Sequence, residues 1–144
     1  MKMNNYPNWL VSIEIAKKLK EIGFDLPTHN TTSIEILENK RYKDENKIYS
    51  KEYVLKGDLY NANETKKGLS IPTWEQVIEW FIEKNLIGKI GYGKFDEKYP
   101  YYTYCITNKM ARVLDYSTDT TRYESYREAR EALINKLVEI YKKE

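Results

Sequence analysis

The chain has 144 residues, a length that suits one domain with a moderate hydrophobic core. Its 24 basic and 22 acidic side chains give a formal net charge of +2, which neither requires nor excludes a polyanionic partner. The single cysteine, Cys105, excludes an internal disulfide and indicates a reducing compartment. No apolar run approaches the roughly 20 residues of a membrane-spanning helix, and no signal peptide is recognisable. We therefore expect a soluble, cytoplasmic single domain over residues 1–144.

The first predicted element is a helix over residues 13–22. Ser12 before it is a suitable N-cap, and Gly23 after it suits the left-handed position that often ends a helix. The apolar residues between them share one helical face: Ile15, Ala16, Leu19 and Ile22.

Two strands are expected next, at residues 32–37 and 47–55, because apolar and polar side chains alternate there. The charged residues 39–46 between them predict a hairpin with a long tip. Residues 57–70 have no usable periodicity, so we expect a surface loop.

A second helix is predicted over residues 73–84. Thr73 is a suitable N-cap, Gln76 can complete a capping box with it, and Asn85 can end the helix. The residues of its apolar face recur at helical spacing: Trp74, Val77, Ile78 and Phe81. We expect that face to be buried.

Two further strands are predicted at residues 89–95 and 99–107, on either side of a turn at 96–98. In the second of them Tyr102, Tyr104 and Ile106 share one face, opposite Tyr101, Thr103 and Cys105. Residues 110–114 predict an additional strand, and residues 115–123 a polar connection.

A closing helix is predicted after Ser125, which can form a capping box with Glu128. Its apolar stripe consists of Ala129, Ala132, Leu133, Leu137 and Ile140. The predicted order is α-β-β-α-β-β-(β)-α. Short connections between strands favour antiparallel pairing, so we expect an α+β fold with three helices and one antiparallel sheet of four to five strands.

Residues with catalytic or metal-binding chemistry are few. One histidine, His29, and one cysteine, Cys105, cannot build a zinc site within one chain, and no signature makes them a nucleophile–base pair. Gly88, Gly91 and Gly93 lack the spacing of a phosphate-binding loop and indicate a bulge or close backbone packing. We expect a protein that is not an enzyme and has no catalytic residue, metal or cofactor.

Residues 84–112 combine an excess of lysine with interleaved aromatic side chains. Cations that contact phosphates and rings that stack on bases are how open sheets hold single-stranded nucleic acid. The candidate binding residues are Lys89, Tyr92, Lys94, Lys98, Tyr99 and Tyr101. The competing explanation, which we favour, is a tyrosine-rich hairpin whose lysines keep a sheet edge soluble.

Three segments resemble one family, the small uncharacterised α+β proteins of prophages and conjugative elements in Bacteroides and its relatives. They are residues 16–25, ending in Gly-Phe-Asp, residues 72–84, and the terminal helix over residues 126–140. The resemblance covers a little under half of the chain, in the order of that family. It implies an α+β fold and an origin in a mobile element, and it assigns no catalytic residue.

These observations favour an accessory or interaction protein of a prophage or mobile element that binds a macromolecular partner. We expect a protein partner, with single-stranded nucleic acid bound at residues 84–112 as the alternative. Homo-oligomerisation stays open, and no membrane association is expected.

Overall fold

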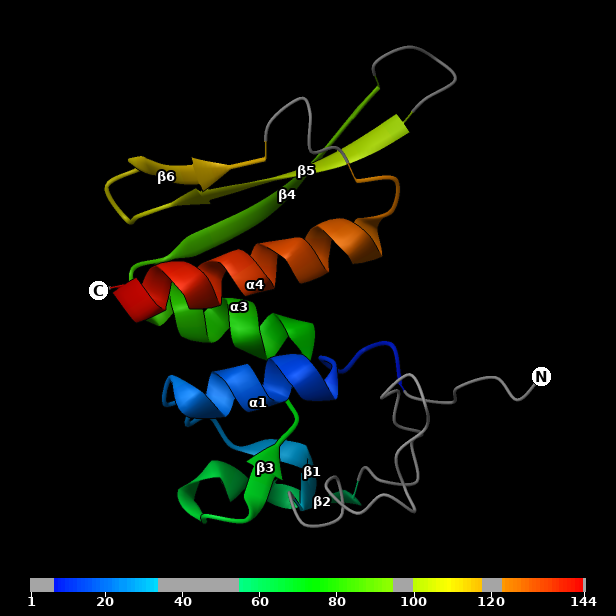
Figure 1. Cartoon of the computed structure of the whole chain (residues 1–144), viewed down its shortest axis with the longest axis vertical. Helices are drawn as coiled ribbons and strands as arrows, with labels where there is room; N and C mark the ends of the chain where they lie inside the picture. Colours follow the sequence, from blue (N-terminus) through cyan, green and yellow to red (C-terminus); the bar gives the residue numbers. More distant parts are fainter. Residues whose placement is uncertain (1–6, 34–54, 95–99, 118–122, 144) are drawn as a thin grey trace, which may run out of the picture. The chain divides into compact units, whose positions relative to one another are not determined.

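The computed structural model describes residues 7–33, 55–94, 100–117 and 123–143 (Figure 1). These residues form three α-helices and two antiparallel three-stranded sheets, which confirms the α+β class. The chain divides into two compact units, residues 1–76 and 77–144. That all 144 residues behave as a single domain stays a prediction. No helix among the described residues combines the length and the apolar character needed to cross a bilayer.

In the first unit, α1 runs from Ile13 to Glu21 and has the ends that its sequence predicts. The Ser12 hydroxyl accepts a hydrogen bond from the backbone N–H of Ile15 at 3.2 Å. Gly23 follows the helix with a φ of 92°, a conformation that costs glycine little. Its N–H and that of Phe24 donate to carbonyls of the last turn, which completes a Schellman motif.

The first sheet contains β1 (Thr28–Ser33), β2 (Leu55–Tyr60) and β3 (Gly68–Ser70), in the order β2-β1-β3. Its central strand, β1, contains no apolar residue, yet three of its threonines are buried. Hydrophobic alternation therefore could not detect β1.

The strand predictions for this unit are corrected accordingly. The first strand was expected over 32–37; β1 begins earlier, at Thr28, and residues 34–37 of the expected range lie outside the described residues. The second was expected at 47–55, but most of that range, like the predicted tip at 39–46, lies outside the described residues. The expected loop at 57–70 is wrong, because it contains most of β2, the 3₁₀-helix η2 (Ala62–Glu64) and β3.

The connection from η2 to β3 is held by Lys20 of α1. Its ammonium group donates to the backbone carbonyls of Thr65 at 2.7 Å and Lys66 at 3.2 Å, and also to that of Gly68. Three carbonyl dipoles thus converge on one cation, which explains how an irregular segment keeps its shape against α1. Burial also lowers the pKa of Lys20.

Helix α3 (Trp74–Glu83) confirms the predicted capping box. The N–H of Gln76 donates to the Thr73 hydroxyl at 3.2 Å, and the N–H of Thr73 donates to the Gln76 side-chain carbonyl at 2.9 Å. The Gln76 amide also donates to the carbonyl of Pro27 at 3.1 Å. Asn85 follows the helix with a φ of 66°, as expected for its end.

The second sheet contains β4 (Ile87–Lys94), β5 (Pro100–Thr107) and β6 (Val113–Tyr116), in the order β4-β5-β6. Helix α4 (Tyr126–Lys143) packs along β4 and β5 (Figure 1). The Ser125 hydroxyl caps it by accepting from the N–H of Glu128 at 3.1 Å.

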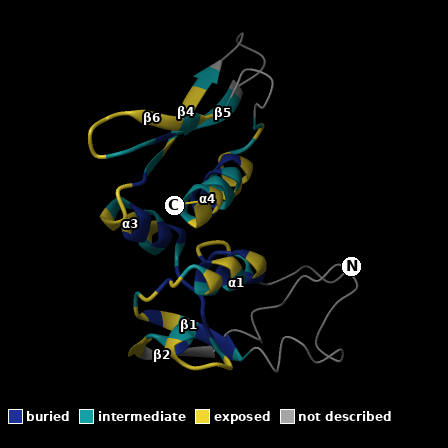
Figure 2. Cartoon of the chain, turned by 60° about the vertical axis from the view of Figure 1, so that its left-hand side comes forward, coloured by how far each residue is buried: buried dark blue, intermediate teal, exposed yellow. Residues whose placement is uncertain are grey.

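Buried apolar side chains of α3, the connection from α3 to β4, the sheet and α4 form the core of this unit: Val77, Trp80, Phe81, Leu86, Ile106, Ala129, Leu133, Ile134, Leu137 and Val138. The helices carry these residues on one side and exposed residues on the other (Figure 2). A Cβ added at Gly88 would lie 2.9 Å from a methyl carbon of Leu133 and 3.2 Å from one of Leu137. The prediction of close backbone packing is confirmed at this glycine.

Two predictions for this unit are corrected. The last strand lies at Val113–Tyr116 instead of 110–114, because residues 108–112 form a turn closed by a hydrogen bond from the N–H of Asn108 to the carbonyl of Arg112. The expected connection over 115–123 begins inside β6, and its last residue, Tyr123, exchanges two backbone hydrogen bonds with Tyr102. The described residues form two sheets of three strands, so the expected single sheet of four to five strands is not confirmed.

Candidate functional site

The register of β4 and β5 decides which candidate residues lie together. Tyr92 pairs with Tyr102, and Lys89 pairs with Cys105. Because paired residues share a face and neighbours along a strand alternate, Tyr92 lies on the same face as Gly88, toward α4. Lys89 and Tyr101 lie on the opposite face. The structure therefore separates Tyr92 from Lys89 and Tyr101.

The remaining predicted site residues are only partly described. Lys94 pairs with Pro100 at the end of the hairpin, and its side chain is outside the description. Lys98 and Tyr99 lie outside the described residues. The proposed basic, tyrosine-rich surface thus has two described members on one face, Lys89 and Tyr101, and one on the other, Tyr92.

On the face toward α4, Tyr92 belongs to a row of aromatic rings. Its ring centroid lies 5.1 Å from that of Tyr102, which lies 6.0 Å from that of Tyr126 on α4. The guanidinium carbon of Arg130 lies 5.6 Å from the Tyr126 ring, one helical turn along. We call Tyr92, Tyr102, Tyr126 and Arg130 the aromatic row. Sequence reasoning missed its last three members.

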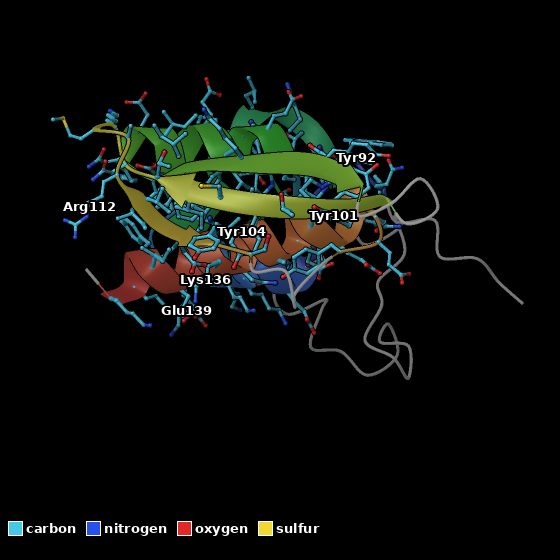
Figure 3. The ribbon with its side chains drawn as sticks, turned by 90° about the horizontal axis from the view of Figure 1, so that it is seen from above. Tyr92, Tyr101, Tyr104, Arg112, Lys136 and Glu139 are labelled. Carbon is cyan, nitrogen blue, oxygen red and sulfur yellow. The ribbon has the colours of Figure 1, made fainter. Side chains whose placement is uncertain are left out.

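The face turned away from α4 carries Lys89, Thr103 and Cys105 as well as Tyr101, which is labelled in Figure 3. A Cβ added at Gly93 would lie 3.0 Å from the Tyr101 ring, so the ring lies against the backbone of its cross-strand partner. Lys89 is exposed on this face and Cys105 is half-buried. Among the described residues of this face, one exposed lysine beside one ring is a weak basis for holding a polyanion.

Tyr104 and Asp115 form a hydrogen-bonded polar pair in this unit. The Tyr104 hydroxyl donates to an Asp115 carboxylate oxygen at 2.8 Å, and Glu139 of α4 lies nearby (Figure 3). Burial raises the pKa of Tyr104 well above its ordinary value, and the hydrogen bond to Asp115 raises it further. The phenol therefore stays protonated at neutral pH and is unsuited to act as a base or nucleophile.

The turn between β5 and β6 is fixed by Asn108. Its side-chain carbonyl accepts hydrogen bonds from the N–H groups of Met110 at 2.9 Å and Arg112 at 3.0 Å. Asn85 supports the same turn, because its side chain accepts from the N–H of Lys109 at 2.7 Å. These bonds hold residues 109–112 in a defined, exposed conformation.

Large apolar side chains are exposed along this turn and β6. The exposed fractions are 86% for Met110, 53% for Val113, 38% for Leu114 and 60% for Tyr116. β6 lies at the end of its sheet's strand order and is largely exposed (Figure 2). We call these four residues the β6 edge. The sequence analysis predicted a strand near these residues but no binding site. The adjacent apolar residues in a short strand after a turn were the signal that could have indicated one.

Within the described part of the chain, no three His, Cys, Asp or Glu side chains are placed to hold a metal ion. His29 lies in β1, with its Nδ1 2.9 Å from the carbonyl oxygen of Gly57. His29 belongs to the first unit and Cys105 to the second.

No protein-family model matches this sequence, and no curated protein or solved structure is significantly similar to it. The resemblance to proteins of prophages and conjugative elements stays a prediction.

Proposed function

We propose that this protein is a non-enzymatic accessory protein of a prophage or mobile element, and that it binds a partner protein through the β6 edge. The observation that carries the proposal is the exposure of Met110, Val113, Leu114 and Tyr116 along one turn and the strand that follows it. The element origin is supported by the resemblance of residues 16–25, 72–84 and 126–140.

Two physical features make this surface suited to a protein. An edge strand presents backbone N–H and C=O groups to which another chain can add. Clustered apolar side chains at such an edge gain free energy when a partner covers them, by about 25 cal/mol for each Å² removed from water. The turn is already fixed by Asn108 and Asn85, so binding does not have to order it.

Single-stranded nucleic acid is the second candidate partner, and the aromatic row is the observation that favours it. Tyr92 and Tyr126 are exposed, and Arg130 adds a cation at one end. Rings of this kind stack on bases at about 1–3 kcal/mol each. Two features argue against nucleic acid. Arg130 is the one basic side chain of the aromatic row, and the acidic residues Glu128 and Glu131 lie beside it on α4.

Site-specific photocrosslinking in the native host separates the two candidates. The photoreactive residue p-benzoylphenylalanine would replace Tyr116 on the β6 edge, Tyr126 in the aromatic row, or Tyr60 as a control. All three tyrosines are exposed, so the replacements are matched in chemistry and accessibility. The proposal expects an adduct at Tyr116 that resists nuclease, and no such adduct at Tyr60. A nuclease-sensitive adduct at Tyr126 without one at Tyr116 would favour nucleic acid instead.

A further inference from the structure

We propose that the β6 edge takes an acidic, extended segment of a partner protein as an additional strand of the second sheet. This inference rests on the proposed function and names the chemistry of the partner. It follows from the direction of the backbone groups of β6 and from the charges beside them.

The hydrogen bonds of β6 indicate which backbone groups point outward. The N–H of Ser117 donates to the Tyr104 carbonyl of β5 at 3.0 Å, so Ser117 bonds inward. In an antiparallel pair, inward-bonding and outward-pointing residues alternate. The backbone N–H and C=O of Tyr116 therefore point away from β5. No other strand among the described residues pairs with that side of β6, so a further strand can bond there.

The side chains of β6 offer an added strand apolar neighbours. Tyr116 pairs with Cys105 and Val113 with Thr107, so both lie on the face turned away from α4. An added strand would place every second side chain on this face, beside Val113 and Tyr116. Leu114 lies at the irregularity between these pairs and is partly exposed. Apolar residues at alternate positions of the partner match this arrangement.

The charges beside the β6 edge are positive. Lys109 and Arg112 are both exposed in the turn that leads into β6, and Arg112 points outward from the end of the sheet (Figure 3). No ion pair within the described part of the chain includes either side chain. The nearest acidic residue in sequence, Asp115, accepts a hydrogen bond from Tyr104. A partner with carboxylates at its remaining positions would complement these two cations.

A second copy of this chain fits the same edge less well. If β6 paired with itself about a two-fold axis at Leu114, Arg112 would lie opposite Tyr116 of the second copy, and Asp115 opposite Val113. Arg112 would then not face a carboxylate. Charge complementarity thus favours an acidic segment of a different protein.

Fluorescence polarisation with synthetic peptides tests this inference. The probe is a fluorescein-labelled hexapeptide of alternating glutamate and valine with blocked ends, compared with the same peptide carrying lysine in place of glutamate. We expect the acidic peptide to bind at least about tenfold more tightly, with an affinity that falls as salt is raised. Methylation of alternate backbone nitrogens on the bonding side should weaken binding at least about tenfold, because strand addition needs those donors.

Charge reversal supplies the matched variants. Lys109→Glu with Arg112→Glu should invert the preference toward the lysine peptide. Lys66→Glu with Arg127→Glu makes the same change in net charge at exposed positions outside the β6 edge and should leave the acidic preference intact. Inversion by both pairs would show that net charge alone decides, and would overturn the inference.

Three other results would also overturn it. They are equal affinity for acidic and basic peptides, undiminished binding of the backbone-methylated peptide, and a concentration-dependent dimer that Leu114→Arg dissociates, which would assign the edge to a second copy. If any of these results occurs while the photoreactive residue at position 116 still captures a protein, only the strand-addition inference fails. If position 116 captures no protein, the proposed function fails with it.

Discussion

Valine substitution at two glycines of β4 tests which face of the second sheet packs against α4. In a strand, replacing glycine by valine gains up to about 1 kcal/mol from strand propensity and from reduced freedom of the unfolded chain. At Gly88 this gain is opposed, because the new Cβ would lie 2.9 Å and 3.2 Å from two methyl carbons of Leu133, which is fully buried. Overpacking of this kind costs about 1–3 kcal/mol.

Gly91 in the same strand provides the matched control. Its added Cβ would meet the Thr103 hydroxyl at 2.9 Å, and Thr103 is half-buried on the face turned away from α4, where its side chain can rotate. We therefore expect Gly88→Val to lower the free energy of unfolding by about 1–2 kcal/mol and Gly91→Val to leave it unchanged or raise it by up to about 1 kcal/mol. Urea unfolding followed by circular dichroism and tryptophan fluorescence measures both changes.

A double-mutant cycle checks the cause. Leu133→Ala alone should cost about 2–5 kcal/mol. In the Gly88→Val background, Leu133→Ala should cost at least about 1 kcal/mol less than it does in the wild type, because the added methyl groups fill part of the cavity. In the Gly91→Val background, the costs of the two substitutions should add within about 0.5 kcal/mol. Equal shifts for the two glycine variants, or strict additivity at Gly88, would refute the packing of this face against α4.

Phe81→Ala should lower the free energy of unfolding in urea by about 3–5 kcal/mol, because Phe81 is fully buried. Glu79→Ala, at an exposed position, should change it by less than about 0.5 kcal/mol. Equal urea midpoints for wild type and Phe81→Ala would contradict the burial. Lys20→Met should cost about 2 kcal/mol, since three carbonyls lose a charged donor, and protection of the Gly68 amide from hydrogen exchange should fall with it. Tyr104 has its pKa raised above 10.0 in the folded chain, so its contribution to stability is complete below pH 10.0 and is lost as the pH rises further. Tyr104→Phe should therefore lose less stability than wild type between about pH 9 and pH 11, and identical losses would contradict the shift.

The helices could be predicted because their signals are local. The capping box of Thr73 and Gln76, the N-caps Ser12 and Ser125 and the helix end at Gly23 each depend on residues a few positions apart. Sequence alone fixes such contacts, because one side chain reaches the backbone of its own helical turn.

The first sheet could not be predicted, because its strands are defined by their neighbours. β1 consists of polar residues, and β3 has three residues. Both are strands because β1 pairs with a neighbour on each side, and its threonine side chains become buried only through that pairing. Alternation of apolar and polar residues reveals a strand only when its buried side chains are apolar, so a central strand that buries threonines shows no such pattern.

The candidate site could be predicted in part, because counting residues outward from a predicted turn gives the pairing of the two strands. A three-residue turn at 96–98 places residue 95 opposite 99 and therefore Tyr92 opposite Tyr102, the register found in the structure. Counting would thus have separated Tyr92 from Tyr101. Tyr126 and Arg130 could not be added in this way, because they reach the aromatic row from α4, through packing that no short-range pattern encodes.

The β6 edge differs because exposure there is a property of the fold. In sequence, Val113, Leu114 and Tyr116 look like an ordinary strand whose apolar residues would enter a core. The structure leaves them exposed, because α4 packs along β4 and β5, and β6 is the last strand of its sheet. An apolar strand left at an edge favours association with other chains, and proteins commonly oppose this with charge. Lys109 and Arg112 repel basic chains and attract acidic ones, so the same two residues that limit non-specific pairing would select the partner.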